Sequence, residues 1–503
     1  MTHSNKPRFA LIMKKLGLAV MLVVCVLWAS IYSISSNKQF GLMGGMAEEY
    51  LALGIHLNQT GLFQLSETSS KPFLFRPPGY VKFLDLAFSC YGQLKPRNHV
   101  FTSQQEAENE QRKIFQVVYV FQCFLLAASS LVLFLHAGQL IPPVSAFFLA
   151  LAFGINPYVI IHVGVAHYEL LHIFAILVST WLLHLAFSSE GGLRKQILWV
   201  ATGACFGVTT LIRPVSLILP AVLAVVVIWQ FRSNLRREAL HWLFFVVSFI
   251  VVLAPWTWRN YQAVKRFIPV NAQANAALWG SSSQALDLDA NHYRWSRVWH
   301  PEGQEIYEAV TGEAGFQTSV YSDHVLSLED EFWTRFKDNL ATKPGVYLSN
   351  VCKNFALMTF GINSVVIKMF QHLQHTDGAL NVQCLAPGAS QDFYPSTASN
   401  AFTLLVMLLS LTGYWGMVAS CVARDHAVLA PLVSFATLII AHTITYTDIM
   451  YYYLRMPLLF IFVALFARHL HQRAFVHADL VRRVLISGTF VYTACLYWTV
   501  IVS

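Results

Sequence analysis

The feature of this 503-residue chain that most limits its fold is the recurrence of long apolar runs. A helix needs about 20 apolar residues to cross the hydrocarbon core of a bilayer. The runs cover residues 16–35, 114–135, 144–161, 169–187, 197–213, 215–231, 239–256, 400–421, 427–446, 455–470 and 484–502. They predict an all-α multi-pass membrane protein with about eleven transmembrane helices.

The charged residues are too few for the other broad classes of protein. They make up 12% of the chain, against about 25% in a typical soluble domain. This composition excludes a disordered chain, a single soluble globule, and a nucleic-acid-binding protein built on basic patches. Partners are therefore expected among membrane lipids and substrates at the membrane, with no nucleic acid.

The short connections between the runs set the orientation. With the N-terminus inside, the inner segments hold Lys6, Arg8, Lys14, Lys15, Arg194, Lys195, Arg232, Arg236, Arg237, Arg424, Arg468, Arg473, Arg482 and Arg483. The acids on the same side are Glu190, Glu238, Asp425 and Asp479. This excess follows the positive-inside rule. The first run follows a basic start, and its length indicates a membrane anchor rather than a cleaved signal peptide.

Two polar regions then lie on the outer side, at 36–113 and 257–399, and they hold most of the acidic residues. The predicted organisation is a transmembrane module over 1–256 that includes the first outer loop, a mostly helical outer segment over 257–399, and C-terminal transmembrane helices over 400–503. Any chemistry is expected on the outer face.

The first candidate for chemistry is the acid pair Glu48 and Glu49 before Tyr50. Two carboxylates just outside a span can accept a proton from an attacking hydroxyl or hold a divalent cation against a phosphate. A solvated helix end is the alternative, because exposed acids are common. Adjacent helical residues point about 100° apart, so only one of the two should face a site. The sequence leaves that choice open.

The second candidate is Arg76 in the sequence Arg-Pro-Pro-Gly-Tyr, which ends at Tyr80. The prolines and glycine force a turn and hold the arginine in an extended conformation. A planar, permanently charged guanidinium at a constrained place suits a phosphate. The alternative is an interfacial arginine that binds lipid headgroups.

The third candidate is Glu169, which opens an apolar run two residues after His167. Ionisable residues at membrane depth are costly and are often functional. A carboxylate is also favoured at a helix N-terminus by the macrodipole, so function and capping stay equally open. His162, His167 and His172 are five residues apart and do not share a helical face, which disfavours a histidine metal site.

Arginines also recur at the outer ends of spans, at Arg213, Arg259 and Arg455, each with proline or aromatic neighbours. Cations are normally scarce there. A bound anion on the outer face explains them. Ion pairing with nearby acids is the alternative.

These segments, taken in order, resemble a known family. The acid pair is followed by Arg-Pro-Pro-Gly-Tyr, the acid at 169, Leu-Ile-Arg-Pro, Ala-Pro-Trp-Thr-Trp-Arg-Asn-Tyr, Lys-Pro-Gly-Val-Tyr-Leu and Tyr-Leu-Arg-Met-Pro-Leu. The order resembles the bacterial polyprenyl-phosphate-dependent glycosyltransferases of the C-type superfold, relatives of protein O-mannosyltransferases and lipid A aminoarabinose transferases. The resemblance covers most of residues 10–470.

The resemblance implies an inner-membrane enzyme that moves a hexosyl or pentosyl group from an undecaprenyl-phosphate donor to a periplasmic protein, lipid or glycan, with inversion. Arg76, with Arg259 or Arg455, would meet the lipid phosphate, and Tyr50, Tyr80 and His167 would contact substrate. The catalytic acids would be Glu48, Glu49 or Glu169. The family's usual aspartate lies four residues before the tyrosine, where this chain has Met46, so the base is left open.

Further expectations follow from the same comparison. Segments 40–60 and 73–90 are predicted to be helices along the outer membrane surface, and Arg76, Arg259 and Arg455 to converge on one anion. The sequence indicates no definite cofactor, and a divalent metal ion is the one candidate. The alternative function is a transporter or flippase for a polyprenyl-linked or anionic substrate, although no internal repeat is evident.

Overall fold

The structure is a computed structural model, and it describes ten stretches of the chain. Apart from a few isolated positions, these are residues 46–65, 73–91, 104–156, 161–232, 235–283, 301–314, 318–360, 397–423, 425–445 and 455–471. The predicted span 484–502 lies outside the described residues, as does 16–35 apart from isolated positions.

Every regular element in the described stretches is helical, as the sequence predicted. Within these stretches, five helices are long and apolar enough to cross a membrane: Arg112–Ala137 in α4, Glu169–Ser188 (α7), Gly192–Ile212 (α8), Glu238–Val264 in α10, and His426–Ile444, which combines η8 and α17. Three shorter apolar helices cover Pro143–Gly154 (α5), Pro214–Gln230 (η3 and α9) and Met456–His469 in α18. The multi-pass all-α class is therefore supported, while the full number of eleven stays a prediction.

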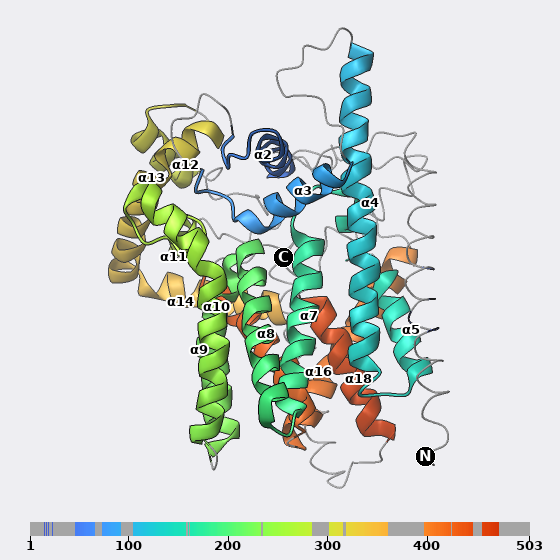
Figure 1. The fold of residues 1–503 in the computed structure, drawn as a ribbon. Helices are drawn as coiled ribbons and strands as arrows, with labels where there is room; N and C mark the ends of the chain where they lie inside the picture. Colours follow the sequence, from blue (N-terminus) through green and yellow to red (C-terminus); the bar gives the residue numbers. More distant parts are fainter. Residues whose placement is uncertain are drawn as a thin grey trace.

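The membrane-spanning helices form one bundle, and the polar elements gather at one end of it (Figure 1). Helices α4 (Gln104–Ala137), α7, α8, α9 (Leu219–Gln230) and α10 (Leu235–Val264) run beside one another, with α16 (Thr397–Val422), α17 (Leu429–Ile444) and α18 (Met456–His471) behind. At the upper end lie α2 (Met46–Thr60), α3 (Pro78–Tyr91), α11 (Ala274–Ser282), α12 (Pro301–Thr311) and α13 (Thr318–Thr342); α14 (Pro344–Phe360) lies beside the bundle.

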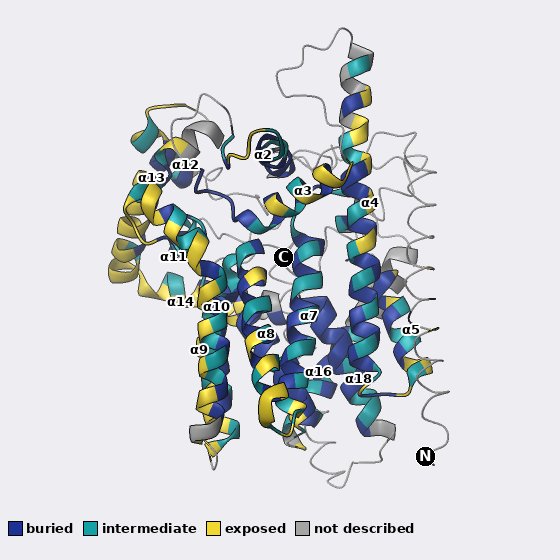
Figure 2. Ribbon diagram, viewed as in Figure 1, coloured by how far each residue is buried: buried dark blue, intermediate teal, exposed yellow. Residues whose placement is uncertain are grey.

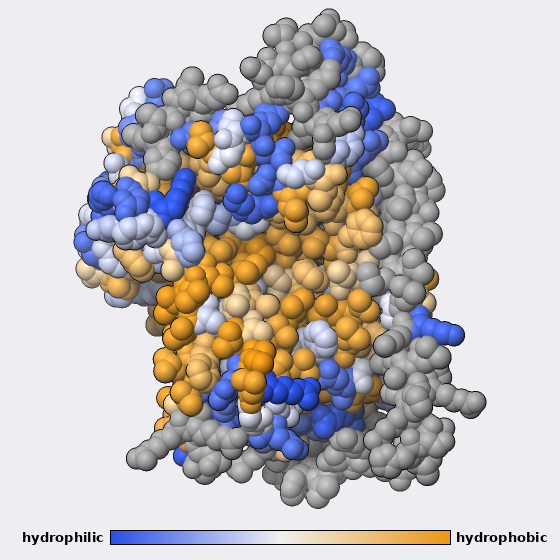
Figure 3. All heavy atoms as spheres, in the orientation of Figure 1, coloured by the Kyte–Doolittle hydropathy of each residue, from blue (hydrophilic) through white to orange (hydrophobic). Residues whose placement is uncertain are grey.

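The distribution of polarity matches a bundle in a membrane. Helices α7 and α18 are largely buried, whereas α9 and α10 carry many exposed residues (Figure 2). Those exposed residues include large apolar ones such as Val247, Ile250 and Val251 of α10. On the face drawn in Figure 3, a broad apolar band separates two hydrophilic ends. Apolar side chains that face lipid need no protein partner, so their exposure is expected.

Glycine lets two pairs of helices approach closely. A Cβ built on Gly203 of α8 would lie 2.1 Å from Ser248 Oγ and 2.2 Å from the carbonyl oxygen of Phe245, both on α10. A Cβ built on Gly416 of α16 would likewise lie 1.9 Å from the carbonyl oxygen of Phe462 on α18. Small residues at such crossings are typical of helices that associate in a membrane, where packing rather than water exclusion drives association.

The predicted boundary after residue 256 falls inside a helix. Helix α10 continues through Pro255 to Val264, although a proline removes one backbone hydrogen bond. Side chains next to the proline tie the end of the helix to the following chain: Trp256 Nε1 donates to Val270 O at 2.8 Å, and Thr257 Oγ1 donates to Pro269 O at 2.9 Å. The outer segment therefore starts as an extension of the span.

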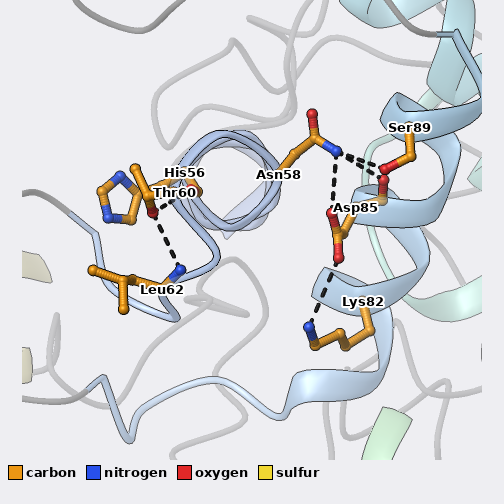
Figure 4. A network of polar contacts seen from close by, with 7 residues as sticks. All are labelled: His56, Asn58, Thr60, Leu62, Lys82, Asp85 and Ser89. Carbon is orange, nitrogen blue, oxygen red and sulfur yellow. Dashed lines mark hydrogen bonds and ion pairs between the residues drawn. The ribbon is translucent and has the colours of Figure 1, made fainter.

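Helices α2 and α3 lie across the upper end of the bundle, as predicted for segments that do not span the membrane (Figure 1). The second helix begins at Pro78, so residues 73–77 are irregular rather than helical. In Figure 4, the Asn58 amide nitrogen donates to both Asp85 O and Asp85 Oδ1, at 3.2 and 3.1 Å, and to Ser89 Oγ at 2.8 Å. These bonds join the two helices into one layer. Asn58 is also the asparagine of a possible N-glycosylation sequence, Asn58-Gln59-Thr60, and its amide nitrogen is used in these bonds.

At the opposite end of the bundle, α8 and α10 share a buried ion pair. Lys195 Nζ lies 3.0 Å from Glu238 Oε1, and His241 Nδ1 lies 3.3 Å from Glu238 Oε2. Lys195, counted above among the inner cations, is therefore neutralised inside the protein.

Replacing Lys195 by methionine should destabilise the fold, because it leaves Glu238 buried without its main counter-charge. The expected loss is about 3 kcal/mol in the free energy of unfolding. Thermal unfolding of the purified protein in detergent checks this. The double variant Lys195→Met/Glu238→Gln should recover part of the loss, and equal stability of the single and double variants would contradict the explanation.

Candidate active site

The first element of the site is a buried ion pair between α2 and the loop that precedes α3. Arg76 Nε donates to Glu49 Oε2 at 2.7 Å, and both side chains are at least nine-tenths buried. The Arg76 guanidinium also lies over aromatic rings, 4.3 Å from the Phe75 centroid and 5.7 Å from that of Tyr50. Charge-assisted bonds of this kind are stronger than neutral ones.

Backbone contacts hold the loop that presents Arg76. The carbonyls of three successive residues each accept a hydrogen bond from α10 or from the chain that follows it: Phe73 O from Arg259 Nη1 of α10 (3.0 Å), Leu74 O from Ala272 N (2.9 Å) and Phe75 O from Asn271 Nδ2 (3.0 Å). On the other side, Gly79 packs on the end of α8, where a Cβ would lie 2.7 Å from the backbone of Ile212. The Pro-Pro-Gly sequence thus serves a close contact as well as a turn.

Burial and charge act in opposite directions on Arg76. Burial lowers its pKa, but the Glu49 carboxylate outweighs burial, and the pKa is raised above its ordinary value. The arginine is therefore charged at every relevant pH. The side chain of Glu48 lies outside the described residues, so Glu49 is the acid of the predicted pair that the structure locates.

The second element is a histidine–carboxylate pair at the start of α7. Glu169 is the first residue of that helix, and His167 lies in the bend before it. His167 Nδ1 and Glu169 Oε2 are in hydrogen-bond contact, and both side chains are buried. Within the described part of the chain, His167 Nε2 and Glu169 Oε1 have no hydrogen-bond partner. Two buried polar atoms without partners are costly in a folded protein.

Tyr50 connects the two pairs. Its ring makes edge-on contacts with Tyr80, His167 and Tyr168, at centroid distances of 5.4, 5.5 and 5.7 Å. Burial raises the pKa of Tyr50 and also that of Tyr80, so both phenols stay protonated. Gln122 of α4 donates to Tyr80 Oη at 3.4 Å. Glu49, Tyr50, Arg76, Tyr80, His167 and Glu169, all predicted as site residues, therefore form one cluster, named here the outer polar cluster.

Arg213 is the seventh member of the outer polar cluster, although the sequence did not single it out from the other outer arginines as a site residue. Its guanidinium carbon lies 5.3 Å from the Tyr168 ring centroid, and its charge interacts with Glu169, Tyr50 and His172. Arg213 ends α8 in an extended conformation before Pro214. The signal for it was present: a charged residue held by proline at the outer end of a span.

The other two predicted arginines are placed differently. Arg259 donates to the carbonyls of Phe63 and Phe73, and its guanidinium carbon lies 4.7 Å from the Trp256 ring centroid. It therefore supports the loop that carries Arg76, and its contacts do not support the predicted convergence on one anion. Arg455 is 2% exposed and lies just before α18. Its meeting with Arg76 stays a prediction.

A metal site is not evident in the described residues, which contain no group of three or more His, Cys, Asp or Glu side chains arranged to hold an ion. Glu49 has a cationic partner in Arg76, which is the arrangement of an ion pair rather than of a free metal ligand. The expectation of a divalent metal ion therefore stays open.

Comparison with known proteins returns structures but no sequence relatives. No family model matches the chain, and no curated protein does either. One similar structure is the archaeal oligosaccharyltransferase AglB from Archaeoglobus fulgidus in complex with an inhibitory peptide and a dolichol-phosphate. It has a TM-score of 0.49 and 11% identity, over 97% of this chain and 55% of that one. This chain thus spans about half the length of that protein.

Another similar structure is ArnT from Cupriavidus metallidurans bound to undecaprenyl phosphate, with a TM-score of 0.40 and 14% identity over 91% of this chain and 78% of that one. Both of these structures hold a lipid phosphate. Both are named as proteins of the kind that the order of the motifs resembles. Structural similarities this weak do not show which reaction this protein catalyses. The evidence on function comes from the outer polar cluster.

Proposed function

We propose that this protein is an integral-membrane glycosyltransferase that moves a sugar from a polyprenyl-phosphate donor to an acceptor outside the membrane. The observation that carries the proposal is the outer polar cluster. Two arginines, two carboxylates and a histidine are buried together where α2 and α3 cross the end of an apolar bundle. A lipid donor would keep its prenyl chain in the bilayer and present its phosphate at this level.

The cluster has the groups that transfer requires. The bond between the anomeric carbon and the phosphate oxygen must break, and negative charge then collects on the leaving phosphate. Positioned guanidinium groups stabilise such charge, and Arg76 and Arg213 supply them. Direct attack by the acceptor inverts the anomeric carbon. The acids of the cluster are Glu49 and Glu169, with Glu48 beside them in sequence.

We propose the donor and the acceptor as chemical classes, together with the membrane in which the protein lies. The donor is an undecaprenyl-phosphate monosaccharide carrying a hexose or pentose, and the acceptor is a periplasmic protein, lipid or glycan. The positive-inside pattern supports an inner membrane with the cluster on the periplasmic side. The Lys195–Glu238 pair at the far end of α8 lies on the cytoplasmic side in this orientation.

A transporter or flippase is the alternative, and the position of the charges argues against it. Transporters of known architecture bind substrate near the membrane midplane, often at broken helices. Here Glu169 is the first residue of α7, Arg213 follows the last residue of α8, and Arg76 lies in a loop. These three charges are at one end of the bundle, where a membrane-bound donor meets an aqueous acceptor.

The test is an assay of purified protein in nanodiscs with a panel of polyprenyl-phosphate sugars and periplasmic extract as acceptor. We expect release of polyprenyl phosphate and a new glycosidic product with one donor, and none with empty nanodiscs. A parallel assay in sealed vesicles follows movement of the same donors between leaflets. Movement without a new glycosidic bond would overturn the proposal in favour of the flippase.

A further inference from the structure

We propose that His167 is the general base of the transfer reaction, that Glu169 is the residue that positions it, and that the acceptor is a hydroxyl. This inference rests on the proposed function and deepens it. The sequence suggested His167 only as a substrate contact and Glu169 as a catalytic acid. The geometry of the pair assigns them different roles.

The two ring nitrogens of His167 have different surroundings. Nδ1 contacts Glu169 Oε2, so the neutral imidazole carries its proton on Nδ1 and leaves a lone pair on Nε2. Nε2 is buried and has no hydrogen-bond partner within the described residues. An acceptor hydroxyl that donates to Nε2 would satisfy this atom. The same arrangement, a carboxylate that orients an imidazole whose far nitrogen takes a proton, operates in hydrolytic triads.

The second step is the choice of imidazole over carboxylate. Glu169 is 1% exposed and heads α7, and it lies in the electrostatic reach of Arg213 and His162. The Glu169 carboxylate already accepts a hydrogen bond from the imidazole through Oε2, so it is placed to orient the ring. In hydrolytic triads a carboxylate in this position holds the imidazole in the correct tautomer and orientation while the far nitrogen takes the proton.

The third step concerns the surroundings that set the behaviour of His167. Within the described residues, the titratable and charged groups around it come from several elements: Glu49 and Tyr50 of α2, Arg76 and Tyr80, His162 of η2 (Ile161–Gly164), Tyr168 before α7, Glu169 and His172 of α7, and Arg213 after α8. Tyr50 packs edge-on against the imidazole at 5.5 Å. Protonation of the imidazole at low pH removes the lone pair and should stop the reaction.

The role of the base names the class of acceptor. In the proposed step the acceptor O–H bond breaks and its proton goes to His167 Nε2. The acceptor oxygen bonds to the anomeric carbon as the bond from that carbon to the phosphate oxygen breaks, and the electron pair leaves on polyprenyl phosphate. A hydroxyl needs such a base, whereas a phosphate monoester or diester is already ionised near neutral pH. We therefore assign a hydroxyl acceptor.

The experiment compares four proteins in nanodiscs: wild type, His167→Asn, Glu169→Gln and His172→Asn. The last is the matched control, a histidine in the first turn of α7 that is also buried and whose ring nitrogens also lack hydrogen-bond partners within the described residues. For each protein, kcat and KM for donor are measured across pH with hydroxyl-bearing and phosphate-bearing acceptors, and binding of undecaprenyl phosphate is measured separately.

We expect His167→Asn to lower kcat by about 10²–10⁴-fold with little change in the KM for donor, and to lose the fall in rate at low pH. Glu169→Gln should also lower kcat, and should shift the fall in rate to lower pH because the imidazole becomes a weaker base. His172→Asn should keep the wild-type profile. Added imidazole should partly restore a His167→Ala variant.

The outcomes separate this inference from the proposed function. Wild-type protein that neither binds undecaprenyl phosphate nor transfers a sugar would refute the function itself. Wild-type transfer that is matched by His167→Asn, with an unchanged pH profile, would refute the base alone. Transfer to phosphate acceptors only would refute the hydroxyl assignment.

Discussion

Replacing Arg76 by alanine should lower the rate of sugar transfer by about 10²–10³-fold, the usual scale for removing one preorganised donor to developing negative charge. The guanidinium is buried beside Glu49 at 2.7 Å and is stacked on Phe75. Its loss removes a positive charge from the leaving phosphate and leaves the Glu49 carboxylate unbalanced. The measurement is kcat/KM for donor, with the yield of monodisperse protein as the check on folding.

Three further variants identify the reason for that loss. Lys82→Ala is the control, because this lysine is exposed and its pairing with Asp85 at 3.7 Å is superficial. Arg76→Lys keeps the charge without the planar fork and should fall between wild type and alanine. In the double variant Arg76→Ala/Glu49→Gln the unbalanced carboxylate is gone. If this double variant regained wild-type activity, Arg76 would serve only to neutralise Glu49, and its proposed contact with the lipid phosphate would be wrong.

Replacing Gly203 by alanine should destabilise the bundle, although alanine normally favours a helix. The new Cβ would lie 2.2 Å from the carbonyl oxygen of Phe245, and a backbone oxygen cannot move without the helix that carries it. Helices α8 and α10 would have to separate. Overpacking of this kind typically costs about 1–3 kcal/mol. We expect a lower midpoint of thermal unfolding and a lower yield of folded protein in detergent.

The control for Gly203 is Gly345→Ala in α14. No atom lies within 4 Å of the Cβ that this change would add, so helix propensity alone should act and stability should stay equal or rise slightly. Equal unfolding midpoints for the two variants would show that the close approach of α8 and α10 does not limit stability. A loss confined to Gly203→Ala would also affect the site, since Arg213 of the outer polar cluster directly follows α8.

Much of the architecture was predictable because it depends on local properties of the chain. An apolar run of about 20 residues has few alternatives to a membrane helix, and α4, α7, α8, α10 and α17 lie where such runs predicted them. The orientation stays a prediction, and it too rests on local properties, since each loop rich in Lys and Arg would act through its own contact with the membrane surface. The constraint that proline and glycine place on Arg76 was also readable from neighbouring residues alone.

The organisation of the site depended on contacts between distant residues, which no local pattern encodes. Glu49 and Arg76 are 27 positions apart, and they meet because α2 and the loop before α3 fold onto the same end of the bundle. Arg259 resembled Arg76 in sequence, yet the carbonyls of Phe63 and Phe73 occupy it as a support for the loop. Arg213 joins the cluster because Gly79 lets α3 rest on the end of α8. Hydropathy places a residue at a membrane depth, whereas packing decides which of the residues at that depth face one another.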